Sequence, residues 1–175
     1  MTGVQTCALP ICAGEHVRAG DVTHGLEDCD ACLAKRLGGA AAGELARRRF
    51  VGGDTSPALV KDWIDVAFPF YTQTAPDPNL WRRIVMKQPV RERFFGPGGE
   101  GRTLDVLREL ARIQCPTLVM GGALDPRAPI ECQRDIAAAI PQHLVRYREF
   151  ENCGHGVIPD VPIEAMALLR EFIAG

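Results

Sequence analysis

Serine is almost absent from this chain, because Ser56 is the only serine in its 175 residues. It lies in the run D-T-S-P and has no glycine two residues before or after it, so it does not match the G-x-S-x-G turn that presents a nucleophilic serine. No G-x-C-x-G replaces this motif. We interpret Ser56 instead as the N-cap of a helix with Pro57 in its first position, and we find no activated nucleophile in the sequence.

Long apolar runs and an excess of charge are also absent. No segment approaches the roughly 18 to 20 apolar residues of a membrane span, and no basic segment leads into an apolar one as in a signal peptide. The 20 basic and 22 acidic residues leave a net charge of -2, without a basic field for nucleic acid.

The 7 cysteines are an odd, scattered set, unlike a disulfide framework. These absences predict a cytoplasmic protein with reduced thiols, whose ligands are small and neutral or weakly charged.

The first residues, M-T-G-V-Q-T-C-A-L-P-I, resemble a translated sequencing adapter. We therefore treat residues 1–12 as an artefactual N-terminal segment and leave it out of the fold prediction. On this interpretation the natural chain is interrupted near Cys12, and its N-terminal part is missing. Residues 13–26 have neither helical nor strand periodicity, which predicts a loop.

A string of short helices is predicted within residues 13–102, which we interpret as a lid or cap region. Apolar residues recur at helical spacing in 26–37, and a second helix is expected at 40–50, each ended by a pair of glycines. The next helix should begin after Ser56 and end near Phe70. Its broad apolar face comprises Leu59, Val60, Trp63, Ile64, Ala67 and Phe70. Shorter helices are expected at 80–87 and 89–95.

Residues 103–175 predict the order α-β-α-β-α, which is typical of a doubly wound α/β fold. The continuous apolar run at 117–120 indicates a strand buried on both faces, and alternating residues at 144–150 predict a half-exposed strand. Pro129 should open the helix between them. The last helix should start near Pro162 and bury Ile163, Met166, Leu169, Phe172 and Ile173. Two strands are too few for a complete sheet, so we expect them to pair with each other and the faces of the first to be incompletely covered.

One acid and one histidine follow the two predicted strands. Asp125 lies in G-G-A-L-D-P-R-A-P after the first strand, and His155 lies in N-C-G-H-G after the second. Functional groups of open parallel sheets gather at the carboxyl ends of the strands. We therefore expect Asp125 and His155 to lie within or near hydrogen-bonding range, as the acid and the base of a catalytic triad.

The run P-T-L-V-M-G-G-A-L-D, followed by one helix, one strand and G-H-G, resembles the C-terminal part of the α/β-hydrolase family. The resemblance covers residues 26–175, is strongest over 103–175, and is closest to the proline-iminopeptidase-like group. It implies an α/β fold, in which this chain is the C-terminal fragment of an α/β-hydrolase: a helical lid followed by α-β-α-β-α.

The resemblance also implies a serine hydrolase that cleaves ester or amide bonds through an acyl-enzyme, without cofactor or metal. In that family the serine lies upstream of the acid, on a G-x-S-x-G turn that this sequence lacks, and the oxyanion-hole loop is absent too. We therefore expect the parent protein to be an enzyme and this chain alone to be inactive. Its substrate is either a small ester or a peptide-like molecule with an N-terminal proline, and the sequence does not separate the two.

Alternatives exist for several of these residues. Asp160, five residues after His155, is a rival acid, although we favour it as the cap of the last helix. A zinc site is an alternative for Cys29 and Cys32, which have C-x-x-C spacing, together with His16 and His24. We favour Cys29 as a packing residue of the predicted helix, because no second C-x-x-C or H-x-x-x-H completes a tetrahedron. Several aromatic residues are interpreted as core rather than as a substrate pocket, namely Trp63, Phe68, Phe70, Tyr71 and Trp81. The non-catalytic alternative is a partially folded fragment or an interaction module that pairs through its exposed sheet edge.

Overall fold

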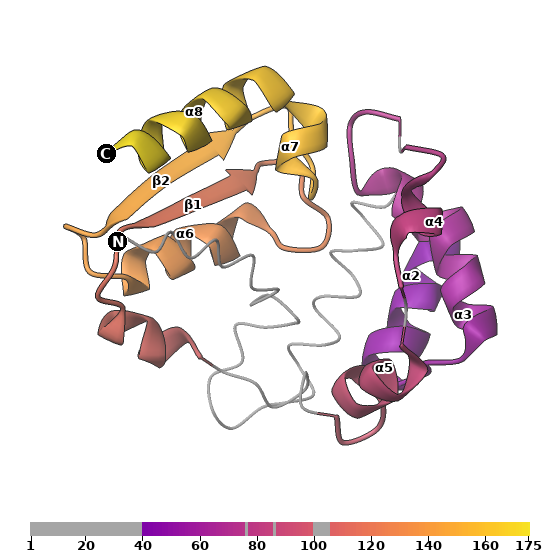
Figure 1. The fold of residues 1–175 in the computed structure, drawn as a ribbon. Coiled ribbons are helices and arrows are strands. Elements are labelled where there is room, and N and C mark those ends of the chain that lie inside the picture. The colour runs from indigo at the N-terminus through magenta and orange to yellow at the C-terminus, as the bar shows by residue number, and fades with distance from the viewer. Residues whose placement is uncertain (1–39, 76, 86, 100–105) are drawn as a thin grey trace. The chain divides into compact units, whose positions relative to one another are not determined.

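The computed structural model describes residues 40–75, 77–85, 87–99 and 106–175 (Figure 1). These residues belong to two compact units. The helical unit comprises the described residues up to Tyr71 and those from Ala75 to 99, and the α/β unit comprises Thr72–Thr74 and 106–175. The predicted helix at 26–37 and the predicted loop at 13–26 lie outside the described residues.

The helical unit consists of short helices that follow one another closely. They are α2 (Ala40–Ala46), the π-helical η1 (Arg47–Val51), α3 (Pro57–Asp62), the π-helical η2 (Trp63–Ala67), the 3-10 turn η3 (Phe68–Phe70), α4 (Leu80–Arg83) and α5 (Gln88–Phe95). The start of α3 is confirmed in detail, because Ser56 Oγ accepts a hydrogen bond from the Leu59 amide at 3.3 Å and Pro57 takes the first position. The helix predicted at 80–87 is shorter and ends at Arg83.

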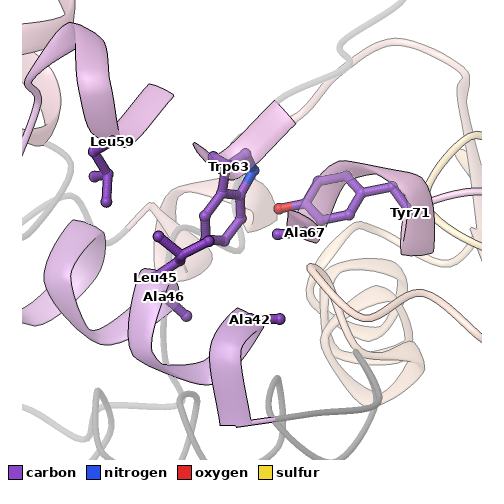
Figure 2. Packing of buried hydrophobic residues seen from close by; sticks show 7 residues of the cluster. All are labelled: Ala42, Leu45, Ala46, Leu59, Trp63, Ala67 and Tyr71. Atoms are coloured by element: carbon purple, nitrogen blue, oxygen red, sulfur yellow. The ribbon is translucent and has the colours of Figure 1, made fainter. Parts of the chain in front are cut away.

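The core of the helical unit is built around the indole of Trp63 (Figure 2). Its buried members are Ala42, Leu45, Ala46, Leu59, Trp63, Ala67 and Tyr71. The rings of Trp63 and Tyr71 meet edge to face, with their centroids 6.1 Å apart. The prediction that Phe70 is buried is wrong, since this residue is 46% exposed. From Leu59 to Tyr71 the buried residues recur every four positions through the wide turn of η2, and this spacing places Tyr71, not Phe70, on the core side.

The α/β unit has the predicted order of elements, with one addition. They are the 3-10 helix η5 (Leu107–Arg112), β1 (Thr117–Gly122), α6 (Ile130–Ala139), β2 (Val145–Phe150), α7 (Val157–Asp160) and α8 (Pro162–Ala174). The short helix α7 was not predicted. The two strands are parallel, in a register that pairs Thr117 with Val145 and Gly122 with Phe150. The strands lie between α6 on one face and α8 on the other (Figure 1). The described residues therefore form a mixed α/β fold with a small parallel sheet.

The incompletely covered sheet agrees with the prediction, whereas burial of α8 differs from it. In β1 only Val119 among the apolar side chains is buried, against Leu110 and Ile140, whereas Leu118 and Met120 are half-buried. Within the described residues β1 pairs with β2 alone, so it lacks the two flanking strands that bury a central strand. On α8 the fully buried residue is Ala165, while Ile163 is 84% and Ile173 is 56% exposed. The predicted burial of Ile163 and Ile173 is therefore wrong.

Candidate functional site

The loops after β1 and β2 bring Asp125 and His155 together at one edge of the sheet. His155 Nδ1 lies 2.9 Å from Asp125 Oδ2, which confirms the predicted hydrogen-bonding distance. Parallel pairing places both strand ends at the same edge, so each loop needs only a few residues to reach the other. The sequence order of acid and histidine therefore becomes a direct contact.

Asp125 is held rigidly in its loop. Its side chain is 5% exposed, and its second oxygen, Oδ1, accepts hydrogen bonds from the backbone amides of Arg127 at 2.7 Å and Ala128 at 2.9 Å. These donors satisfy a buried carboxylate oxygen that would otherwise be costly to remove from water. The other oxygen is thereby aimed at the imidazole of His155.

The histidine loop lies directly on the end of β1. The Leu124 amide donates to the Cys153 carbonyl at 2.9 Å, and the Ala123 amide donates to the Phe150 carbonyl at 3.0 Å. Gly122 makes this approach possible, because a Cβ atom there would lie 2.1 Å from the Gly154 carbonyl oxygen. Gly122, the last residue of β1, thus allows the histidine loop to pack closely on the strand.

Asp160 has a different role from either of those proposed from the sequence. It does not cap α8, whose N-cap is Val161 without a side-chain hydrogen bond. Its Oδ2 atom accepts from the Gly154 amide at 2.7 Å, and its Oδ1 atom accepts from the amides of Gln73 and Thr74 at 2.8 and 3.0 Å. The prediction that Asp160 caps the last helix is wrong; its carboxylate instead binds the backbone beside His155.

The charge on Asp160 follows from these contacts. Partial burial raises the pKa of its carboxyl, but the hydrogen bonds donated by Gly154, Gln73 and Thr74 outweigh burial, and the net pKa lies below its ordinary value. Asp160 is therefore a carboxylate at neutral pH, and each of its hydrogen bonds is charge-assisted.

The described residues offer no activated nucleophile in this unit. Cys153, two residues before His155, is completely buried, and burial, followed by the nearby carboxylates of Asp160 and Asp125, raises the pKa of its thiol to about 12. Its thiol donates to the Gly154 carbonyl at 3.4 Å. Because the thiolate is the nucleophilic form, Cys153 is a packing residue at neutral pH. Ser56 belongs to the helical unit, where its hydroxyl caps α3.

Metal and membrane sites find no support in the part of the chain that the structure describes. There, no three His, Cys, Asp or Glu side chains come together as metal ligands. The conceivable zinc ligands lie outside the described residues; they are Cys29, Cys32, His16 and His24. Across the described ranges, no helix has both the length and the apolar composition to cross a bilayer.

The aromatic residues mainly form core, as predicted. Trp63 and Tyr71 are buried, and Phe68 packs against their cluster. Phe70 is exposed, and the side chain of Trp81 lies outside the described residues. Trp63 and Tyr71 are therefore explained by packing within the helical unit, without a substrate pocket.

The arrangement of Asp125 and His155 has a defined chemical capacity. A carboxylate only accepts hydrogen bonds, so its contact with Nδ1 selects the imidazole tautomer that carries the proton on Nδ1. The other nitrogen, Nε2, is then the basic one, and the His155 side chain is 43% exposed. Such a pair can remove a proton from a neighbouring group and return it.

No protein-family model and no curated protein matches this chain. The functional assignment therefore depends on the geometry of Asp125 and His155. Sequence reasoning predicted that these two residues lie close together but missed the contacts of Asp160 with residues 72–74. The available signal was an acid shortly after the histidine, but nothing in the sequence connects it to Gln73 or Thr74.

Proposed function

We propose that this chain carries the acid and the base of a serine-type α/β-hydrolase that cleaves ester or amide bonds through an acyl-enzyme. The observation that carries the proposal is the 2.9 Å contact between His155 Nδ1 and Asp125 Oδ2, at the carboxyl ends of adjacent parallel strands. A fixed, buried acid next to a partly exposed histidine is the arrangement that a general base requires.

Each residue has one role in this mechanism. His155 Nε2 takes the proton of the attacking serine hydroxyl and then gives it to the leaving group. Asp125 keeps the proton of the neutral ring on Nδ1 and stabilises the imidazolium that forms. The water that attacks the acyl-enzyme is activated by the same nitrogen.

The serine and the oxyanion hole come from polypeptide other than residues 13–175. Ser56 caps a helix and Cys153 is a buried thiol, so neither is available to attack a carbonyl group. The helical unit corresponds to the lid region that the family resemblance implies. The substrate is a small ester or a peptide-like molecule with an N-terminal proline.

The test is to read the coding DNA upstream of codon 13 and to express the extended protein. We expect a G-x-S-x-G motif there, whose serine reacts with a fluorophosphonate probe and supports hydrolysis of p-nitrophenyl esters. His155→Ala and Asp125→Asn should each lower kcat by roughly 10⁴-fold, the loss typical of a triad member. His143→Ala is the matched control, because His143 is an exposed histidine in the turn before β2 and should leave kcat unchanged.

Two results would contradict the proposal. One is an extended protein in which no serine reacts, or in which ester hydrolysis is the same with and without His155. The other is fluorophosphonate labelling of Ser56 in the 175-residue chain, because this hydroxyl would then be a nucleophile and not only a cap.

A further inference from the structure

Asp160 forms hydrogen bonds with the two residues that flank His155 in the chain. Its carboxylate accepts from the amide of Gly154, at 2.7 Å, and its own amide donates to the carbonyl of Gly156, at 3.0 Å. Gly154 and Gly156 are the two neighbours of His155 in the chain. We infer that Asp160 is a positioning residue, which holds the backbone of His155 so that its ring meets Asp125; the functional meaning of this inference rests on the proposed role of His155.

The need for such a residue follows from the glycines. Glycine loses more conformational freedom on folding than any other residue, so a histidine between two glycines is poorly fixed by its own backbone. Gly122 cannot compensate with a side chain, because the loop already lies against its Cα atom. A charge-assisted hydrogen bond to the Gly154 amide supplies the missing restraint.

The carboxylate also binds a segment far away in the sequence. Its Oδ1 atom accepts from the amides of Gln73 and Thr74 and from the Thr74 hydroxyl, the last at 2.9 Å. The same segment packs on the loop, since a Cβ atom at Gly156 would lie 2.8 Å from Thr72 Cγ2. The histidine loop is thus enclosed between the end of β1 on one side and residues 72–74 on the other, and Asp160 binds both the loop and this segment.

The substitution Asp160→Asn distinguishes a positioning role of Asp160 from a general contribution to the stability of the unit. The amide group keeps the size of the carboxylate but has one acceptor oxygen instead of two, so it cannot serve both Gly154 and the donors at 72–74. Glu164→Gln is the matched control, because it removes a nearby exposed acid at the start of α8. Both variants are made in the 175-residue chain.

The readouts are the imidazole nitrogen signals of His155 and hydrogen exchange at the Gly154 amide, both measured by NMR. In the unmodified chain we expect a single tautomer protonated at Nδ1, and a protected Gly154 amide that exchanges together with the Asp160 amide. Asp160→Asn should make Gly154 exchange faster by about ten- to a hundredfold, the loss of one hydrogen bond to a charged group, and should shift the His155 ring towards a mixture of tautomers. Glu164→Gln should change neither signal.

Three results would overturn the inference. The first is a Gly154 amide that already exchanges at the rate of an unstructured chain in the unmodified protein. The second is an unchanged His155 tautomer in folded Asp160→Asn. The third is loss of amide protection throughout β1 and β2 in that variant, since Asp160 would then hold the whole unit and not the histidine loop. None of these readouts requires activity, so they are independent of whether the extended protein hydrolyses esters.

Discussion

Two adjacent glycines at the end of β1 differ in what surrounds them. A Cβ atom at Gly122 would collide with the backbone carbonyl oxygens of Gly154 and Cys153, at 2.1 and 2.4 Å. A Cβ atom at Gly121 would meet side-chain atoms of Gln133 and Ile130, at 2.9 and 3.1 Å. Side chains can adjust their torsion angles, whereas the carbonyl groups belong to the loop that carries His155.

Gly122→Ala should therefore destabilise the α/β unit more than Gly121→Ala. Overpacking against backbone costs roughly 1–3 kcal/mol of unfolding free energy, and we expect Gly122→Ala near the upper end of this range. Urea unfolding followed by far-UV circular dichroism measures the unfolding free energy of each variant. Equal losses of unfolding free energy in the two variants would contradict this prediction. They would show that the histidine loop moves to accommodate a Cβ atom as readily as the side chains do.

Residues with local signals were predicted best. Ser56 is confirmed as a cap, because a cap bonds to an amide within its own helical turn. The proximity of Asp125 and His155 was predicted because each follows a strand, and the ends of parallel strands lie at the same edge of a sheet. Asp160 was misassigned because its partners Gln73 and Thr74 lie 87 and 86 residues away in the sequence.

At the scale of elements, α8 shows the limit of apolar patterns. Its position was predicted correctly, with Pro162 in the first turn. The pattern nevertheless favoured burial of Ile163, which is exposed, while Ala165 is 0% exposed. A helix rich in apolar residues has several candidate faces, and contact with the neighbouring elements selects one of them.

The stability of α8 variants should follow the observed burial. Ile163→Ser changes an exposed side chain and should alter the unfolding free energy by less than about 0.5 kcal/mol. Ala165→Leu inserts a large side chain where there is no free space and should cost about 1–3 kcal/mol. Thermal and urea unfolding of the two variants provide the comparison. A larger loss for Ile163→Ser than for Ala165→Leu would mean that the opposite face of α8 is the buried one.

At the scale of the whole molecule, each unit contains a carboxylate whose pKa is lowered by hydrogen bonds. In the helical unit, bonds from the side chain and backbone of Ser56, followed by one from Arg48, lower the pKa of Asp54 to about 2. In the α/β unit, hydrogen bonds lower the pKa of Asp160 despite its partial burial. A lowered pKa in the folded state means that unfolding is accompanied by proton uptake at acidic pH.

Acid should therefore destabilise the chain partly through Asp160. Since its folded pKa lies below the unfolded value, near 4, its contribution is complete above that value and is lost as pH falls through the folded pKa. The difference in unfolding free energy between the unmodified chain and Asp160→Asn should be constant from about pH 7 to pH 5 and shrink below about pH 4. Urea titrations at successive pH values measure it. A difference that grows on acidification would mean that the pKa is raised, contrary to this assignment.

The sequence by itself determined the order and the main boundaries of the elements, the cap at Ser56, and the two residues that follow the strands. These features depend on interactions within a few residues, or on the general geometry of parallel strands, and both can be read from a linear chain. Only the tertiary structure decided which atoms of Asp125 and His155 meet, which apolar residues are buried, and that Asp160 binds the loop of the histidine. Those outcomes depend on the packing of segments distant in sequence, for which a local pattern contains no information.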